Sequence, residues 1–192
     1  MRELFFATSN KGKFSYLSDR FRDFGVNLTM APMELPEPRS DNLQEIAKEK
    51  ALSAFAKLKK PCIVTDAGFY VRSLNGFPRA FTNFALKTIG IEGILRLAEG
   101  KPRNCEFINC IAYMDSKLKE PAFFEMGIRG MLSETPRGKL SEVDWSELSL
   151  IFIPEGETKT LGEMITEKRK QLVNQRWGHT YRDVAGWLLK RK

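Results

Sequence analysis

A polar turn follows the first apolar run of the sequence, and its side chains have the chemistry to bind a phosphate. The run "LFFA" leads directly into the residues Thr8, Ser9, Asn10, Lys11, Gly12 and Lys13. Where such a turn joins a strand to the start of a helix, its backbone N–H groups and the positive end of the helix dipole favour an anion. The turn lacks the spacing of a P-loop, so a purely structural role as a helix cap stays open.

Two acids further along the chain have the chemistry to hold a metal beside such a phosphate. Glu37 lies in the turn "LPEP", and Asp66 ends the apolar run "CIVTD", where α/β sheets commonly place ligand-binding groups. Magnesium bound to both carboxylates would bridge them to phosphate oxygens and orient a water, whose proton Asp66 could take. Each acid also has a structural interpretation, Glu37 as a surface turn residue and Asp66 as a partner of turn amides.

The alternation of apolar runs and helical patterns around these residues predicts an α/β fold. Strands are expected at residues 3–8, 26–32, 61–68, 104–115, 121–131 and 148–154. Helices are expected at residues 10–25, 43–60 and 83–100, and over most of the chain after Thr160. The helix at 43–60 would be capped by Ser40 or Asp41. We expect the strands to form one long mixed sheet, to which residues 104–131 contribute a hairpin.

Length and composition are those of a globular protein. With 192 residues, 42% of them hydrophobic, the chain can bury one sizeable core or two small lobes, and we expect one bilobal domain over residues 1–192. No apolar run is long enough to span a membrane and no signal-peptide pattern is seen, so we expect a cytoplasmic protein. Three isolated cysteines and one histidine argue against a zinc site and imidazole catalysis. A net charge of +7 favours an anionic partner, either nucleotide or nucleic acid.

Five segments of the chain, in their order and separation, resemble the inosine triphosphate pyrophosphatase family, the Ham1-like enzymes of nucleotide house-cleaning. They are "TSNKGK", "LPEP" with "NLQEIAKEKALSAF", "IVTDAGFYVRSLNGFPRAF", "IFIPEGETKTLGEM", and the spaced pair Lys170 and Arg176. Together they cover almost the whole chain, which makes the resemblance more specific than any one motif.

The resemblance implies a fold, an activity and an assembly. The fold would be an elongated α/β structure in which a mixed sheet with flanking helices forms two lobes around a central cleft. The activity would be hydrolysis of a nucleoside triphosphate, usually the deaminated purines ITP, dITP or XTP, to the monophosphate and pyrophosphate with Mg²⁺. The assembly would be a homodimer, and neither a membrane nor a nucleic acid belongs to this expectation.

The resemblance also implies roles for individual residues. Glu37 falls on the family's metal-binding glutamate, Asp66 on its catalytic and metal-binding aspartate, and Lys13 on a lysine that stabilises charge during catalysis. The expected substrate-binding residues are those of the turn from Thr8 to Lys13, with Ala67, Trp145, Lys170, Asn174, Gln175 and Arg176.

The chain departs from the family beside the metal and around the base. The replaced positions are Thr65 and Ala67 next to Asp66, Arg79 in a turn usually rich in glycine, Leu148 to Leu150, and Asn174 with Gln175. Groups for the triphosphate and the metal are largely retained, whereas groups that would contact the purine are replaced. We therefore expect a broadened or shifted choice of base. The alternative is a catalytically impaired relative that binds nucleotide or nucleic acid, against which the retained carboxylates argue.

Overall fold

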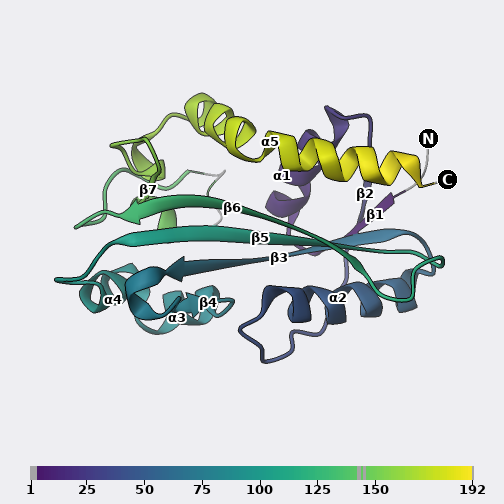
Figure 1. Ribbon diagram of the computed structural model, residues 1–192, viewed down its shortest axis with the longest axis horizontal. Coiled ribbons are helices and arrows are strands. Elements are labelled where there is room, and N and C mark those ends of the chain that lie inside the picture. The colour runs from purple at the N-terminus through teal and green to yellow at the C-terminus, as the bar shows by residue number, and fades with distance from the viewer. Residues whose placement is uncertain (1–3, 142–143, 145, 192) are drawn as a thin grey trace. The chain divides into compact units, whose positions relative to one another are not determined.

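The structure, a computed structural model, describes residues 4–141, 144 and 146–191. The described residues form a mixed seven-stranded sheet in the order β2-β1-β3-β5-β6-β7, with β4 pairing with β3 (Figure 1). The strands are β1 (Leu4–Ala7), β2 (Leu28–Ala31), β3 (Cys62–Val71), β4 (Pro78–Arg79), β5 (Asn104–Met114), β6 (Ala122–Leu132) and β7 (Phe152–Pro154). The helices are α1 (Lys11–Arg22), α2 (Leu43–Leu58), α3 (Thr82–Thr88), α4 (Gly90–Leu97) and α5 (Thr166–Lys190). The mixed α/β fold expected from the sequence is confirmed.

Two of the expected elements have different boundaries. The strand expected at 61–68 continues to Val71, because Phe69 and Tyr70 pair with the antiparallel strand β4. The helix expected at 83–100 is two helices, α3 and α4, which meet at Gly90 with a φ of +66°. A left-handed residue interrupts the helical hydrogen bonds, and glycine adopts that conformation at little cost.

Two further expectations about local structure were wrong. The strand expected at 148–154 begins as a 3₁₀ helix, Glu147–Leu150, and only Phe152–Pro154 is strand. The cap of α2 is Asn42, whose side chain accepts a hydrogen bond from the N–H of Gln44. The Ser40 hydroxyl instead accepts a hydrogen bond from the N–H of Asn42 and donates one to Glu45. Ser40 therefore holds the capping residue in place but does not cap the helix itself.

The chain is divided into two compact units that alternate along the sequence. Unit 1 consists of Met1–Asp66, Asn109–Met126 and Trp177–Lys192, and unit 2 consists of Ala67–Ile108 and Gly127–Arg176. Strands β3, β5 and β6 and helix α5 each contribute residues to both units.

Unit 1 contains the parallel part of the sheet. Strand β1 pairs in parallel with β2 and with β3, and helices α1 and α2 lie on opposite faces of these strands (Figure 1). Because helices cover both faces, β1 carries the unbroken apolar run "LFFA" rather than an alternating pattern. The rings of Phe21 in α1 and Tyr181 in α5 meet edge to face at a centroid distance of 6.0 Å, which packs the second part of α5 against α1.

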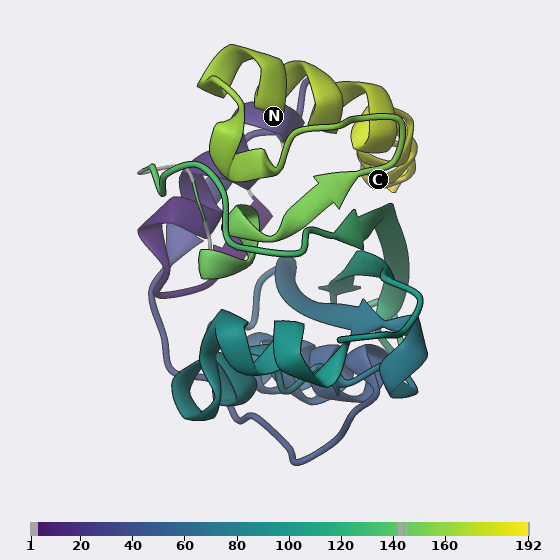
Figure 2. The ribbon, with the colours of Figure 1, turned by 90° about the vertical axis from the view of Figure 1, so that its left-hand side faces the viewer.

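Unit 2 is built on an aromatic cluster. In Figure 2, α3 and α4 lie below its strands, and β7 and the first turns of α5 lie above them. The ring of Phe107 lies 4.7 Å from that of Phe69 and 4.8 Å from that of Phe152, measured between centroids. These three rings join strands β3, β5 and β7 within the unit.

Helix α5 contributes a buried ion pair to unit 2. The guanidinium of Arg169 donates to Asp144 Oδ1 at 2.6 Å and to Ser141 Oγ at 3.1 Å, and its Nε donates to the carbonyl of Met164. This basic residue therefore holds the loop before β7 against the helix. Although α5 is 25 residues long, no helix among the described residues combines the length and apolarity needed to cross a membrane.

Candidate active site

The two acids singled out from the sequence share one partner, Lys50 of helix α2. The ammonium nitrogen of Lys50 lies 2.8 Å from Glu37 Oε1 and 2.7 Å from Asp66 Oδ2. The side chains of Lys50 and Asp66 are 11% and 14% exposed, whereas that of Glu37 is 77% exposed. The structure thus brings the two carboxylates together within unit 1, with a positive charge between them.

Helix α2 directs Lys50 inward because this residue belongs to the helix's buried stripe. The buried residues of α2 are Leu43, Ile46, Ala47, Lys50, Ala51 and Ala54. Their spacing of three and four residues puts them on one face of the helix. A lysine on that face must be paired with charges of opposite sign, and the two carboxylates supply them.

Strand pairing brings the polar turn to the level of Asp66. Phe6 of β1 lies opposite Ile63 of β3 in a parallel register. The end of β1 at Ala7 is therefore beside Val64, two residues before Asp66, and the polar turn begins there. Asp66 lies in the middle of β3 and not at a strand end, which corrects its expected position. The polar turn lies at the level of Asp66 because β1 is short. It ends at Ala7, whereas β3 continues past Val64 to Val71.

The turn from Thr8 to Lys13 caps helix α1 and keeps two backbone donors available. Asn10 Oδ1 accepts from the N–H of Lys13 at 2.9 Å, and Thr8 Oγ1 accepts from the N–H of Asn10 at 3.1 Å. Ser9 Oγ donates to the carbonyl of Met33. Within the described residues, the N–H groups of Lys11 and Gly12 have no acceptor, as is usual in the first turn of a helix. The helix-capping and anion-binding interpretations are therefore compatible.

Lys13 lies within electrostatic reach of the Lys50 cluster. Burial lowers the pKa of its ammonium, the charge of Lys50 lowers it further, and the charges of Asp66 and Glu37 partly oppose this. Among the described residues the Lys13 ammonium forms no ion pair. A partly buried cation without a fixed partner suits an incoming anion, because little solvent screens its charge.

The carboxylates fit a magnesium ion that arrives with phosphate groups. Among the described residues there is no group of three or more metal-ligating side chains. Glu37 and Asp66 offer hard oxygen donors that already meet at one cation. Magnesium in proteins is commonly held by one or two carboxylates, with phosphate oxygens and waters completing the octahedron. The donor set therefore fits Mg²⁺ bound together with a polyphosphate better than Mg²⁺ in an all-protein cage.

The remaining predicted residues that the structure describes belong to unit 2. Ala67 is its first residue, directly after Asp66. In α5, the guanidinium of Arg176 donates to the carbonyl of Glu155 at 2.6 Å, while Asn174 and Gln175 are exposed. Lys170 also belongs to α5, but its side chain lies outside the described part, and Trp145 lies outside the described residues. The structure therefore gives positions for Arg176 and the two amides only within unit 2.

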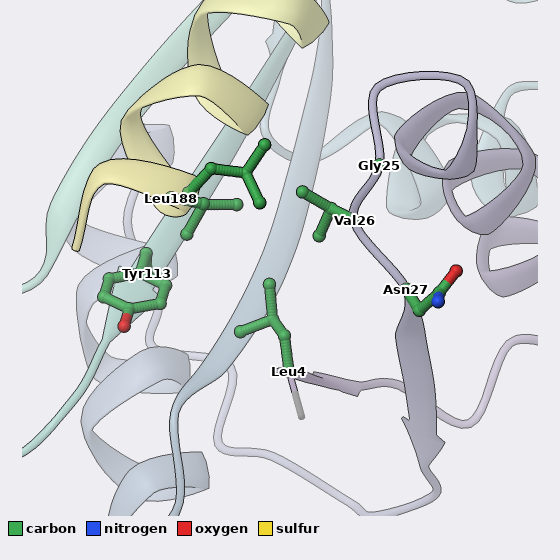
Figure 3. A pocket seen from close by; sticks show the side chains of 7 residues that line it. Leu4, Gly25, Val26, Asn27, Tyr113 and Leu188 are labelled. Atoms are coloured by element: carbon green, nitrogen blue, oxygen red, sulfur yellow. The ribbon is translucent and has the colours of Figure 1, made fainter. Parts of the chain in front are cut away.

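A small pocket in unit 1 lies at the opposite end of β1 from the polar turn. Its lining residues are Leu4, Gly25, Val26, Asn27, Tyr113, Leu188 and Leu189. In Figure 3 the side chains of Leu4, Val26 and Leu188 point toward a common space. The cavity volume is about 70 Å³ and no acid or base lines it, so it is too small and too apolar for a nucleotide.

Comparison with known proteins places this chain in a family. The model of the Ham1 family matches residues 4–177. The chain belongs to the Ham1 family. Among Ham1 relatives, the dITP/XTP pyrophosphatase of Methanopyrus kandleri is 35% identical over 96% of this chain and 99% of its own length. That of Saccharolobus solfataricus is 36% identical over 93% of this chain and 88% of its own length.

Solved Ham1 structures share the fold. A HAM1 protein from Coxiella burnetii superposes with a TM-score of 0.82 at 20% identity, covering 99% of this chain and all of that chain. The Ham1 protein of Staphylococcus aureus gives a TM-score of 0.78 at 20% identity over the whole of both chains. The Ham1 resemblance drawn from the sequence is thus confirmed for both family and fold.

Sequence reasoning missed Lys50. A signal was present, because Lys50 occupies the same helical face as Ile46, Ala47 and Ala54 in the predicted helix. A charged residue on an apolar stripe is almost never left buried without a partner, so its position called for nearby acids.

Proposed function

We propose that this Ham1 protein hydrolyses a deaminated purine nucleoside triphosphate, such as dITP, XTP or ITP, to the monophosphate and pyrophosphate. Family membership and the named activity of relatives at 35% and 36% identity support the reaction class. The structural observation that carries the proposal is the Lys50 bridge between Glu37 and Asp66, within electrostatic reach of Lys13. A protein that merely bound polyanions would gain nothing from two carboxylates at its anion site.

The polar turn and the ammonium of Lys13 would bind the triphosphate. The free N–H groups of Lys11 and Gly12, at the positive end of α1, would donate to phosphate oxygens. The ammonium of Lys13, partly buried and without an ion pair among the described residues, would neutralise charge that develops on the leaving pyrophosphate. Thr8, Ser9 and Asn10 would hold the turn in shape through the hydrogen bonds that they already form.

Asp66 would act on the attacking water. The water oxygen forms a bond to the α-phosphorus, the bond from that phosphorus to the bridging oxygen of pyrophosphate breaks, and the proton of the water passes to Asp66. Glu37 and Asp66 would hold Mg²⁺, which when bound supplies positive charge to the phosphate oxygens and orients them. Before metal and nucleotide bind, Lys50 holds the Asp66 carboxylate in place, because its ammonium donates to Oδ2 at 2.7 Å.

The choice of base would differ from that of typical family members. Leu148 and Ser149, at positions where the family has base-contacting residues, are buried in unit 2. Asn174 and Gln175 are exposed amides, each able to donate and accept hydrogen bonds, which would tolerate several base edges. Ala67, Trp145, Lys170 and Arg176 complete the proposed substrate-binding set on the strength of the family resemblance.

The assembly and location are proposals on the same basis. We propose a homodimer in the cytoplasm, which the Ham1 resemblance supports. Light scattering on the purified protein tests the dimer, and a mass of about one chain at micromolar concentration would contradict it.

The activity is tested by pyrophosphate release from ITP, dITP, XTP, GTP and ATP in the presence of Mg²⁺. We expect release from at least one deaminated purine, and a loss of about 10²-fold or more in kcat for Asp66→Asn, the size usual for a general base. Glu37→Gln is expected to lose activity as well. Glu34→Gln is the matched control, since Glu34 lies in the same exposed segment and its carboxylate is outside the cluster.

Two results would contradict the proposal. One is the absence of pyrophosphate with all five nucleotides, which together with nucleotide binding would favour the non-catalytic alternative. The other is an Asp66→Asn variant with unchanged kcat, which would place the chemistry elsewhere.

A further inference from the structure

We propose that Lys50 is the built-in counter-ion of the Glu37 and Asp66 pair, and that it excludes Mg²⁺ from them until a polyphosphate arrives to take over its ammonium. The inference rests on the proposed function and extends it to the order of binding. Metal alone would not load this enzyme, whereas metal and nucleotide would load together.

Geometry supports competition between the lysine and the metal. The Lys50 ammonium contacts Glu37 Oε1 at 2.8 Å and Asp66 Oδ2 at 2.7 Å. Glu37 and Asp66 would hold a magnesium ion through their carboxylate oxygens, and the ammonium now occupies one oxygen of each carboxylate. Both cations cannot occupy the space between the same two oxygens, so one must leave for the other to bind.

Charge supports the need for a polyphosphate. Glu37 and Asp66 carry two formal negative charges, and Lys50 and Lys13 carry two positive ones, so the four groups together are neutral. A divalent cation added alone would leave an excess of two positive charges where Lys50 and Asp66 are only 11% and 14% exposed. Such an excess is costly at low solvent exposure. A triphosphate removes it by bringing several negative charges.

The side chains can make the exchange with little change in the fold. Lysine has a flexible four-carbon stem, so its ammonium can turn toward a phosphate while helix α2 stays in place. Glu37 lies in a turn and is 77% exposed, so its carboxylate is free to re-orient around a metal. Thr65, next to Asp66 in β3, supplies no third carboxylate that would hold a metal against Lys50.

The test measures metal binding without turnover. Wild-type protein and Lys50→Met are titrated with Mn²⁺, a substitute for Mg²⁺ with the same preference for oxygen, and protein-bound metal is separated by ultrafiltration. We expect Lys50→Met to bind Mn²⁺ at least about tenfold more tightly than wild type, because a like charge has been removed from a partly buried site. Lys48→Met is the matched control, since Lys48 lies on the same helix and its ion pair with Glu120 is exposed.

A second titration needs no variant and decides the question if Lys50→Met does not fold. The α,β-methylene analogue of dITP, which resists cleavage at the proposed bond, is added to the wild-type protein. We expect protein-bound Mn²⁺ to appear only with the analogue. Tight Mn²⁺ binding by wild type without nucleotide, or equal Mn²⁺ affinity in wild type and a folded Lys50→Met, would overturn the inference.

Pyrophosphate release by wild type, measured in parallel, separates this inference from the proposed function. Release together with nucleotide-independent Mn²⁺ binding would remove the inference and leave the function standing. No release, with Mn²⁺ binding that still requires the analogue, would remove the function and leave the role of Lys50 intact.

Discussion

Lys50 donates to Asp66 across 2.7 Å and thereby ties helix α2 to the middle of strand β3. Because both side chains are largely buried, this contact has a consequence for stability that is separate from any role in catalysis. Removing the lysine would leave the Asp66 carboxylate poorly solvated and without this ion pair. The contact therefore links the stability of unit 1 to the chemistry of its candidate site.

Lys50→Met is expected to lower the free energy of unfolding by about 3 kcal/mol at pH 7, the usual effect of breaking a buried ion pair. Adding Asp66→Asn should recover part of that loss, because an amide is cheaper to bury than a carboxylate that has lost its ion pair with Lys50. Urea unfolding of the two variants and the wild type measures both effects. A loss below about 1 kcal/mol would mean that water reaches Asp66 freely.

Arg169→Met is expected to destabilise the protein by about 3 kcal/mol, because the Asp144 carboxylate would remain buried without its main partner. Lys168→Met, one residue earlier, is the control. Its ion pair with Glu157 is partly exposed and should contribute less than about 1 kcal/mol. Equal effects of the two substitutions on urea unfolding would contradict the buried pairing.

Stability is expected to fall below about pH 4, and Asp144 should account for part of the decline. Burial alone would raise the pKa of Asp144, but hydrogen bonds from Arg169, Ser149 and Ser141 outweigh it and lower the pKa. A carboxyl group with a lower pKa in the folded state adds stability above its unfolded pKa and loses it as pH falls through the folded value. Urea unfolding from pH 7 to 2.5 should therefore show a shallower decline for Asp144→Asn. An unchanged slope would show that other carboxyl groups dominate.

Lys13→Ala is expected to lower kcat/KM by about 10- to 100-fold through lost charge stabilisation, with the fold intact. Lys57→Ala, an exposed lysine that contacts the carbonyl of Glu34, should retain wild-type kinetics. Thermal melting of both variants checks the fold. Unchanged kinetics in Lys13→Ala would give the polar turn another role.

The alkaline limit of kcat/KM should lie below the pH at which an exposed lysine deprotonates. Burial lowers the pKa of Lys13, so the charged form needed for phosphate is lost earlier as pH rises. Arginine keeps its charge at these pH values, so Lys13→Arg should move the limit upward. If the alkaline limit of kcat/KM is the same in Lys13→Arg as in the wild type, a group other than Lys13 sets that limit.

Much of the site could be predicted from the sequence because several site residues follow directly after strands that are recognisable as short apolar runs. The apolar run of β1 ends at Ala7, and the polar residues after it could only form a turn before the next helical pattern. Glu37 and Asp66 were found through chemistry and family resemblance, although Asp66 was expected at a strand end and lies within β3. The continuation of that strand depends on pairing with β4 across the positions of Phe69 and Tyr70, which local sequence does not reveal.

Lys50 and Arg169 escaped prediction for a common physical reason. Lysine and arginine in a helical segment are usually solvated, and only tertiary contacts decide which of them turn inward. Asn42 caps α2, whereas Ser40 or Asp41 was expected to do so. Each of these three neighbouring polar residues could cap a helix, and the path of the preceding turn determines which of them does.

The alternation of the two units along the chain governs how this protein can be taken apart. The polypeptide passes from one unit to the other four times, after Asp66, Ile108, Met126 and Arg176. No single proteolytic nick or terminal deletion can release either unit whole. Grafting unit 2 from a relative would require transplanting residues 67–108 and 127–176 together. The two grafted segments would have to continue strands β3, β5 and β6 and helix α5 without a shift in register.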